Sequence, residues 1–494
     1  ELISLPMRYF TSVLIVINMS VFRTGLLLSF ILLANSVFAQ SGYKIEIKIN
    51  NYKNDTLLLG YYLGDRQYVK DTAISKKGVF SFTGKNDLDP GVYMAVLLPE
   101  KNVFQFVVDK DNRFFSIEAD GANLSKKLKV KNSDENTIFF NYIHFLTSQR
   151  PMADSLRSKQ QIIQDPVEKQ KLAEKIDEID QRVYKMQDDY VSKYPQSFTA
   201  KLIQTSKEQF IPKYGQNDDM ETKLRQYNKY KDHYLDNMDF SDERLFRSPV
   251  YFQKIDNYIQ NITLQQPDSL IKALDIVLAK VKVIPDAFKF YLSHYFNFFI
   301  KSKFVGMDAV YVHLIDQYYS KGLAPWVDKE NLQKMVDAAN DARPTLVGRI
   351  APNLTFINQK DSMDIRLHDI VSPYTVMFFW APDCSHCEKA VPIVLDFYEK
   401  YKDKGVKVFA VCTGLLDEAK DCWKNVVKKH MEPFVNVYDP VLLSNFKVIY
   451  NIKSTPQFFI LDKDKKILSK GIGADQLNEV MGKIMEFDKN NHQQ

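Results

Sequence analysis

Apolar and charged residues alternate with a period of two near the start of the chain. In residues 43–49 the order is Tyr-Lys-Ile-Glu-Ile-Lys-Ile, which is typical of a strand with one buried face. Similar runs follow as far as residue 119, and turn residues separate them at intervals of roughly ten positions. Short strands at this spacing predict an antiparallel β sandwich or barrel. The predicted strands are 43–49, 56–63, 67–73, 79–82, 92–98, 103–109 and 114–119.

From about residue 135 to about residue 343 the apolar positions follow a helical period. The clearest seam comes after Pro166, a residue that suits the first turn of a helix, and its members are spaced alternately four and three positions apart. A helix packed within this region and a coiled coil that binds a partner both fit such a seam. The seam consists of Leu172, Ile176, Ile179, Val183, Met186 and Tyr190.

Aromatic residues crowd positions 288–299, in the order FKFYLSHYFNFF. Large rings at this density predict buried core rather than an exposed docking surface. His294 lies within the run, and no second metal ligand follows it at the next helical turn. We therefore expect His294 to be a packed side chain and not a metal ligand.

The C-terminal part of the chain, residues 345–494, alternates buried strands with helices. The near-continuous apolar run 373–381 is typical of a strand covered on both faces. The whole order is that of a βαβ unit followed by a hairpin and a covering helix. The predicted elements are strand 373–381, helix 385–402, strand 406–412, helix 417–429, strands 457–461 and 466–470, and helix 475–486.

The first 39 residues are expected to be an export signal. Arg23 precedes the apolar run 25–34, and Val37-Phe38-Ala39 puts small residues where a signal peptidase would cut before Gln40. The apolar run is too short to span a bilayer. The alternative is an uncleaved anchor that joins 9–22 to 25–34, which would hold Arg23 inside the membrane at an energetic cost.

Composition agrees with a globular protein of several domains. A chain of 494 residues is long enough for about three domains. Hydrophobic residues make up 45% and charged residues 26%, which excludes collagen-like and disordered chains. The net charge of +5 is too small to indicate binding to nucleic acid. We divide the chain into a signal region (1–39), a β-rich domain (40–134), an α-helical domain (135–344) and an α/β domain (345–494).

The four cysteines all lie between residues 384 and 422, so a disulfide-stapled scaffold is excluded. Cys384 and Cys387 form a Cys-x-x-Cys motif between the strand 373–381 and the helix 385–402. This spacing lets both sulfurs meet within one helical turn, so a disulfide can form and break. Cys384 lies at the helix N-terminus, where free N–H groups and the helix dipole lower the pKa of a thiol. These features predict Cys384 as the nucleophile and Cys387 as the resolving cysteine of thiol–disulfide exchange.

Two neighbours of Cys384 have opposite effects on the stability of its thiolate. His386 can donate a hydrogen bond or add positive charge, whereas Asp383 places negative charge beside the same sulfur. The redox direction therefore stays open. Cys412 and Cys422 fit two buried thiols, a structural disulfide or a second redox pair. No second cysteine pair completes a zinc site around the motif, and we expect neither a metal nor a cofactor.

The residues around the motif resemble the thioredoxin-like thiol-disulfide oxidoreductases of the alkyl hydroperoxide reductase and thiol-specific antioxidant superfamily. Residues 379–387, with Pro392 five positions after the second cysteine, are similar to their active-site helix. Residues 348–352 resemble the opening of the exported members, and 454–456 resemble the cis-proline loop. The front of the chain, at 60–64 and 91–93, is similar to a β domain of unknown function. In exported proteins of certain Gram-negative bacteria, a helical region joins that domain to such modules.

The resemblance implies a thioredoxin-like fold for 345–494 and a periplasmic location. It implies that Trp380, Asp383 and His386 support the active site, that Pro456 shapes the substrate groove as a cis residue, and that Thr455 offers backbone groups to a bound peptide. The implied partners are client proteins with thiols or disulfides and a membrane or periplasmic redox partner. An oligomeric state is not predicted.

Three positions depart from the family pattern. Asp383 replaces the tryptophan that usually precedes the first cysteine, and Phe378 and Ala390 stand where relatives carry an acid. Glu388 or water is left as proton acceptor for Cys387. We predict an exported enzyme that exchanges disulfides with protein substrates. The alternatives are a thiol peroxidase or antioxidant protein, which the absence of a peroxidatic Pro-x-x-x-Thr-x-x-Cys motif argues against, and a binding protein with a structural disulfide.

Overall fold

The computed structural model describes residues 41–124, 128–207 and 219–491. The predicted signal region lies outside these residues, and none of the helices within them is long and apolar enough for a bilayer span. The described chain forms two compact units. One comprises the residues up to Gly60 together with Val69–Ser148, and the other comprises Tyr61–Tyr68 together with the residues from Gln149 onward.

The N-terminal β region forms from the strands that the alternation predicts, each within two residues of its predicted bounds, and from one short strand that was not predicted. The strands are β1 (Tyr43–Asn50), β2 (Thr56–Leu63), β3 (Arg66–Ile74), β4 (Val79–Gly84), β5 (Gly91–Leu97), β6 (Asn102–Val108), β7 (Phe114–Asp120) and the unpredicted β8 (Lys129–Lys131). They make two four-stranded sheets, in the orders β4-β1-β7-β8 and β3-β2-β5-β6.

The expectation of a wholly antiparallel β domain is wrong at one pair. β1 lies parallel to β7, whereas it pairs with β4 in the antiparallel sense. A parallel pair needs a long connection, which the strands between β1 and β7 provide. The period-two pattern is the same in both orientations, so the sequence does not distinguish them. The buried faces agree with the alternation: Ile45, Ile47 and Ile49 are buried, and the charged residues between them, Glu46 and Lys48, are not. The face-to-face sandwich stays a prediction.

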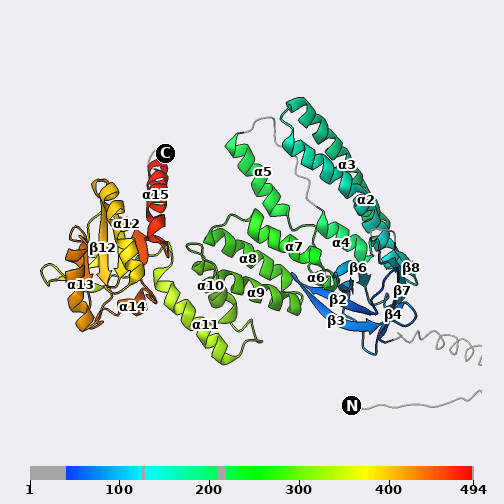
Figure 1. Ribbon diagram of the computed structural model, residues 1–494, viewed down its shortest axis with the longest axis horizontal. Helices are drawn as coiled ribbons and strands as arrows, with labels where there is room; N and C mark the ends of the chain where they lie inside the picture. Colours follow the sequence, from blue (N-terminus) through cyan, green and yellow to red (C-terminus); the bar gives the residue numbers. More distant parts are fainter. Residues whose placement is uncertain (1–40, 125–127, 208–218, 492–494) are drawn as a thin grey trace, which may run out of the picture. The chain divides into compact units, whose positions relative to one another are not determined.

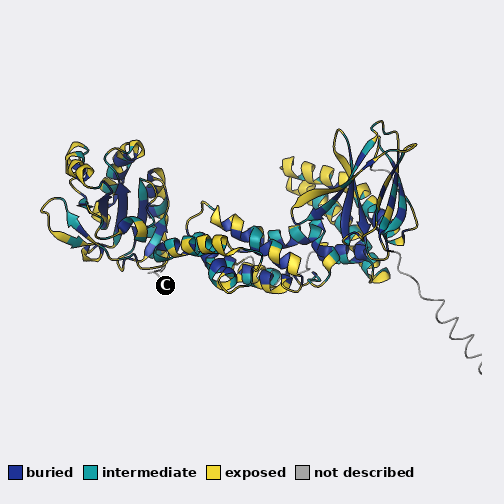
Figure 2. Ribbon diagram, turned by 90° about the horizontal axis from the view of Figure 1, so that it is seen from below, coloured by how far each residue is buried: buried dark blue, intermediate teal, exposed yellow. Residues whose placement is uncertain are grey.

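The middle region is helical, as predicted. Its α-helices are α2 (Asp134–Ile162), α3 (Pro166–Lys193), α4 (Phe198–Ser206), α5 (Met220–His233), α6 (Glu243–Phe246), α7 (Pro249–Asn257), α8 (Pro267–Val281), α9 (Pro285–Ile300), α10 (Asp308–Leu314) and α11 (Lys329–Ala342). Helix α3 begins at Pro166, and the Asp165 side chain caps it by accepting a hydrogen bond from the Val167 N–H at 2.8 Å. In Figure 2 buried and exposed residues alternate around these helices, as expected of helices with one packed face.

The predicted aromatic core of α9 is confirmed. Phe288, Tyr291 and Tyr295 are buried. His294 packs among rings, with its centroid 5.2 Å from that of Phe252, and burial lowers its pKa. The seam of α3 is half-buried except at Ile179, which is buried completely.

The C-terminal part is a seven-stranded mixed sheet with helices (Figure 1), in the order β10-β9-β13-β12-β11-β14-β15. The elements are β9 (Thr355–Asn358), β10 (Asp364–Arg366), β11 (Tyr374–Trp380), α12 (Ser385–Tyr401), β12 (Val406–Cys412), α13 (Asp417–Lys428), β13 (Val435–Tyr438), α14 (Phe446–Ile449), β14 (Gln457–Leu461), β15 (Ile467–Lys470) and α15 (Leu477–Asn491). Strands β11, β12 and β13 are parallel, so their carboxyl ends meet at one edge of the sheet.

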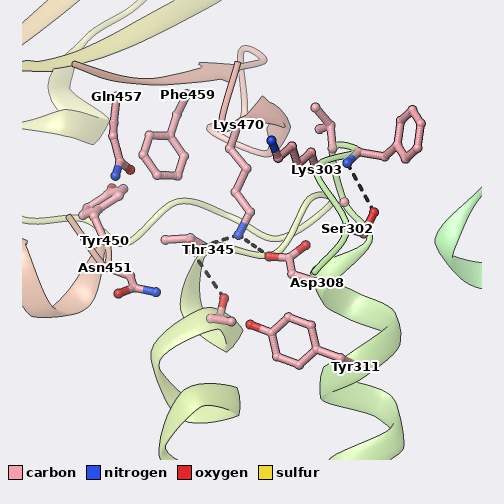
Figure 3. Close-up of a pocket in the computed structure, with 15 residues that line it drawn as sticks. Ser302, Lys303, Asp308, Tyr311, Thr345, Tyr450, Asn451, Gln457, Phe459 and Lys470 are labelled. Carbon is pink, nitrogen blue, oxygen red and sulfur yellow. Dashed lines mark hydrogen bonds and ion pairs between the residues drawn. The ribbon is translucent and has the colours of Figure 1, made fainter. Parts of the chain in front are cut away.

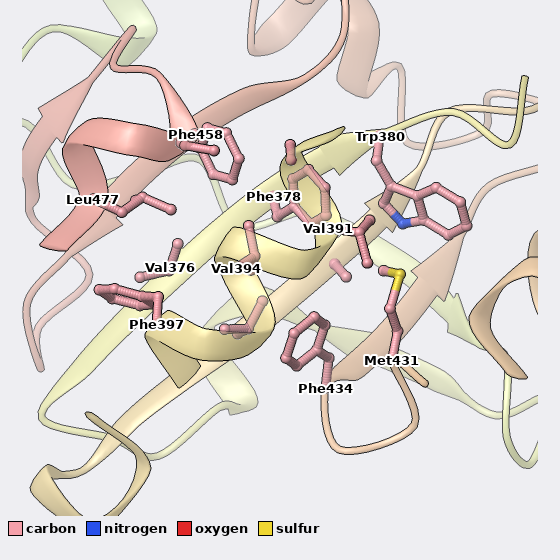
Figure 4. Close-up of a cluster of buried hydrophobic side chains, with 14 of the residues drawn as sticks. Val376, Phe378, Trp380, Val391, Val394, Phe397, Met431, Phe434, Phe458 and Leu477 are labelled. Carbon is pink, nitrogen blue, oxygen red and sulfur yellow. The ribbon is translucent and has the colours of Figure 1, made fainter. Parts of the chain in front are cut away.

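Strand β11 has a hydrophobic core on each side. Val376, Phe378 and Trp380 join α12 in one core, which Figure 4 shows, whereas Met377 and Phe379 point into the other. Burial on both faces explains why this strand reads as a continuous apolar run. The carboxyl end of β11, where Cys384 follows, is thereby held between two packed layers.

Candidate functional site

Cys384 caps the N-terminus of α12. Its backbone is extended, with φ −84° and ψ 110°, and the Cys387 N–H donates a hydrogen bond to its sulfur at 3.1 Å. A sulfur in the capping position meets N–H groups that have no partner within the helix. Negative charge at this sulfur is therefore stabilised by the helix that the sequence starts there.

The pKa of the half-buried Cys384 thiol lies below its ordinary value. Burial acts against ionisation and is the largest single effect on this pKa. Hydrogen bonds with the side chains of Cys387 and Thr455 and with the backbone N–H groups of Cys387 and His386 together outweigh it. These hydrogen bonds are therefore the physical reason why the Cys384 thiol ionises more readily than an ordinary thiol.

Cys387 has the opposite environment. Its side chain is fully buried, and burial together with its hydrogen bond to Cys384 raises its pKa to about 12. The structure holds both cysteines as free thiols. One sulfur is therefore reachable and easily ionised, while its neighbour stays protonated and shielded.

The predicted cis-proline loop faces the first cysteine. The Thr455–Pro456 peptide bond is cis, and the Cys384 thiol donates a hydrogen bond to the Thr455 carbonyl at 3.3 Å, across 71 positions of sequence. Both loop residues are partly exposed. A polypeptide bound at Cys384 would therefore meet the backbone of this loop.

The other predicted site residues take less direct places. Trp380 is buried in the core beneath the site, and its carbonyl accepts a hydrogen bond from the Thr413 N–H at 2.8 Å. Asp383 and His386 are both exposed. Among the residues that the structure describes, no hydrogen bond joins either of these two side chains to the sulfur of Cys384. His386 contributes through its backbone N–H.

No carboxylate takes the positions where relatives carry an acid. Phe378 stacks on Phe458 with ring centroids 4.9 Å apart, and Figure 4 shows both rings in the core. Ala390 is buried. Glu388 is 64% exposed at its side chain and pairs with Lys429 at 3.5 Å, so it faces solvent and not the buried thiol. Of the two candidate proton acceptors for Cys387, this geometry favours water over Glu388.

Cys412 and Cys422 form a disulfide, which the sequence left open. Their Cα atoms are 6.2 Å apart and both side chains are fully buried. Cys412 ends β12 in register with Trp380, and Cys422 lies in α13. The bond ties the middle of this helix to the strand beside β11.

A cavity of about 430 Å³ begins beside Gln457, the residue after the cis-proline, and sequence reasoning missed it. Figure 3 shows Lys470 of β15 reaching into it. The Lys470 ammonium lies 2.5 Å from the Asp308 carboxylate of α10 and donates to the Thr345 hydroxyl at 3.3 Å. This ion pair joins the helical region to the C-terminal sheet. No local pattern signals it, because the partners lie far apart in sequence.

Three family models match separate parts of the chain. Residues 346–484 match the Redoxin family. Residues 43–139 and 218–343 match two domains of unknown function, DUF4369 and DUF5106.

Curated relatives match the C-terminal part. Over 149 residues the chain is 30% identical to "Thiol-disulfide oxidoreductase ResA" of Bacillus cereus (strain ZK / E33L). This alignment covers 30% of the present chain and 82% of the relative. The protein of the same name in Bacillus subtilis (strain 168) is 26% identical over 130 residues, covering 26% and 68%.

Solved structures also match parts of the chain. A domain of a possible thiol-disulfide isomerase from Cytophaga hutchinsonii is 32% identical and covers 30% of this chain and 98% of that one, with a TM-score of 0.28. A thioredoxin-like protein from Bacteroides caccae is 17% identical and covers 56% and 98%, with a TM-score of 0.40.

Proposed function

Because this chain belongs to the thioredoxin-like thiol-disulfide oxidoreductases, we propose that it exchanges disulfides with protein substrates through Cys384 and Cys387. The observation that carries the proposal is the opposed environment of the two sulfurs. Cys384 is half-buried with a lowered pKa, and Cys387 is fully buried with a pKa of about 12. Attack and resolution need such a division of roles.

In the first step the Cys384 thiolate attacks one sulfur of a client disulfide. A new S–S bond forms between enzyme and client, the client S–S bond breaks, and the second client sulfur leaves as a thiolate. The carbonyl of Thr455, which accepts from the Cys384 thiol, and the cis-proline after it would border the client at this stage.

In the second step Cys387 resolves the mixed disulfide. Burial holds the pKa of Cys387 high, and the neighbouring Cys384 sulfur raises it further. That second effect ends once Cys384 is bonded to the client, so the Cys387 proton becomes easier to remove. Its proton passes to the departing client thiolate, directly or through water. The Cys387 sulfur bonds to Cys384, and two electrons have moved from the enzyme pair to the client disulfide. The same steps in reverse oxidise a client dithiol.

The other regions of the chain would be exported together with the catalytic domain and would support it. We propose a signal region (1–39), a β domain (40–134), a helical domain (135–344) and the catalytic domain (345–494), in the periplasm. Export rests on the sequence pattern that ends at Ala39. N-terminal sequencing of the exported form should find Gln40 first, and retention of Met19 would favour a membrane anchor.

Reduction of insulin disulfides by the purified chain tests the exchange. The wild type should accelerate the reaction in the presence of a dithiol reductant, and Cys384→Ser should lose this activity. Ser385→Ala, one position further along the same helix, keeps both sulfurs and should retain it. Consumption of hydrogen peroxide without insulin reduction would favour the thiol peroxidase instead.

A further inference from the structure

A second cavity in the C-terminal domain lies near the carboxyl ends of the strands that follow β11. It measures about 340 Å³ and opens where the loops after β12 and β13 meet. The Leu416 N–H donates to the Pro440 carbonyl at 3.0 Å and holds these two loops together. The residues that line the cavity are Gln359, Leu416, Ala419, Lys420, Trp423, Tyr438 and Pro440.

The walls of this cavity are mostly apolar and reachable from solvent. Leu416 is 70% exposed and Trp423 is 37% exposed, so both apolar side chains meet solvent at this surface. Leu416 has φ 49° and ψ −115°, a backbone conformation that a leucine rarely adopts. Backbone strain of this kind occurs most often at functional sites, where the surrounding structure holds a side chain in position.

Two polar side chains interrupt the apolar wall, Lys420 and Gln359. Lys420 pairs with the Asp417 carboxylate at 2.8 Å. Gln359 follows β9, and both its side-chain nitrogen and its side-chain oxygen are buried. Within the described part of the chain neither atom has a hydrogen-bond partner. A buried amide without partners costs free energy, so it marks a place where a ligand can bind favourably. An amide offers one acceptor and two donors, which complement the N–H and C=O of a peptide backbone.

The cavity is also held rigidly relative to Cys384. The Cys412–Cys422 disulfide closes the segment that carries Leu416, and Cys422 is the residue before Trp423. Cys412 is in register with Trp380, at the end of the strand that leads to Cys384. The apolar wall and the reactive sulfur are therefore fixed to adjoining strands of one sheet.

We propose that this cavity binds the client polypeptide beside its reactive cysteine. An apolar client side chain would lie between Leu416 and Trp423, and the Gln359 amide would hydrogen-bond the client backbone. Neighbouring strands lie about 4.8 Å apart, so β13 lies about 10 Å from β11, and β9, which Gln359 follows, lies about 14 Å from β11. An extended chain reaches the apolar wall at β13 in about three residues and Gln359 in about one residue more. The preferred client is thus an extended segment with an apolar residue about three positions from its cysteine. This inference rests on the proposed function and names its substrate class.

The test compares two short peptides, each with one cysteine carried as a mixed disulfide with thionitrobenzoate. One peptide has leucine three positions from the cysteine and the other has serine there. Attack by reduced Cys384 on the peptide sulfur releases coloured thionitrobenzoate and joins the peptide to the enzyme. The purified wild-type chain should react about tenfold faster with the leucine peptide, since an apolar pocket discriminates by roughly this factor.

Two variants test the cavity directly. Gln359→Leu removes the unpaired amide, and Leu416→Gly removes the exposed wall and relieves its backbone. Both should lose most of the preference for the leucine peptide. Val371→Gly alters a residue that is 85% exposed, just before β11 at the other end of that strand, and should leave the preference intact.

Free dithiobisnitrobenzoate, which has no peptide, separates this inference from the proposed function. All four proteins should react with it at similar rates. If they do, and the wild type treats both peptides alike or Gln359→Leu keeps the preference, the cavity is not a client site although the enzyme is a thiol-disulfide oxidoreductase. If the wild type does not react with the free disulfide, the proposed function fails and the inference fails with it.

Discussion

At the scale of single residues, two cysteines three positions apart are made chemically different by their surroundings. The sulfur of Cys384 caps a helix, and a backbone N–H and the Thr455 carbonyl contact it. Cys387, one turn further, enters a hydrophobic core. The same side chain thus has a lowered pKa in one place and a raised pKa in the other.

This difference predicts the order of alkylation. Because the pKa of Cys384 is lowered, its thiolate is populated at a lower pH than that of an ordinary thiol, whose pKa is about 8.5. Iodoacetamide should therefore label Cys384 first. The labelling rate should rise with pH and reach its plateau at a lower pH than that of an ordinary thiol. Cys387, with a pKa of about 12, should stay unlabelled through this range. Mass mapping across a pH series measures both, and earlier labelling of Cys387 would contradict the assignment.

Substitution of the two cysteines should have unequal effects on bound clients. Cys387→Ser should accumulate enzyme–client mixed disulfides, because nothing resolves the bond at Cys384. Cys412 and Cys422 are bonded to each other and cannot take that role. Cys384→Ser should accumulate none. A non-reducing gel of periplasmic extract shows the outcome, and bands in Cys384→Ser alone would reverse the assigned roles.

At the scale of elements, the disulfide and the ion pair described above stabilise different junctions. The Cys412–Cys422 bond closes a segment with a sequence separation of 10 and holds α13 to β12. Closing a loop of this length removes conformational entropy from the unfolded chain worth about 2–3 kcal/mol. Neither sulfur touches solvent, so this bond should stay closed when Cys384 and Cys387 are reduced.

Removal of the bond tests whether it is structural. Cys412→Ala with Cys422→Ala should lower the free energy of unfolding by about 2–3 kcal/mol and leave reaction with dithiobisnitrobenzoate unchanged. Denaturant unfolding measures the first and initial rates measure the second. A large loss of rate with unchanged stability would instead indicate a second redox pair.

At the scale of the whole molecule, the Lys470–Asp308 ion pair joins the helical region to the C-terminal sheet. Lys470 and Asp308 have side chains only 16% and 19% exposed, and the Thr345 hydroxyl adds a further bond (Figure 3). An ion pair this far from solvent depends on both partners, because loss of one leaves a poorly solvated charge.

Lys470→Met should therefore destabilise the junction by about 1–3 kcal/mol, a value reduced from that of a fully buried pair because some solvent reaches it. Limited proteolysis should then cut faster between residues 302 and 307 or near 346–350. Lys453→Met is the matched control, since Lys453 is 75% exposed and lies 3.8 Å from Asp341. Equal cleavage in both variants would show that the ion pair does not hold the junction.

The longest and most regular elements were predictable from local pattern. The strand 406–412 and the helix beginning at Pro166 follow from periodicity and capping, which act over a few neighbouring residues. Strands β8, β9, β10 and β13 escaped prediction because three or four residues are too few for a period to stand out. Their places in the sheets depend on partners elsewhere in the chain. The equally short β15 was predicted from the hairpin that joins it to β14.

By itself the sequence determined that a cysteine would stand at the start of a helix, because strand end, Cys-x-x-Cys and helix start are adjacent in the chain. Family resemblance, rather than spacing, pointed to the loop of Thr455. Only the tertiary structure decided that β1 would lie parallel to β7, that Cys412 would bond to Cys422, and that the Gln359 amide would be buried with no partner among the described residues. Each of these depends on how distant segments pack, and local pattern carries no record of which distant side chains will meet.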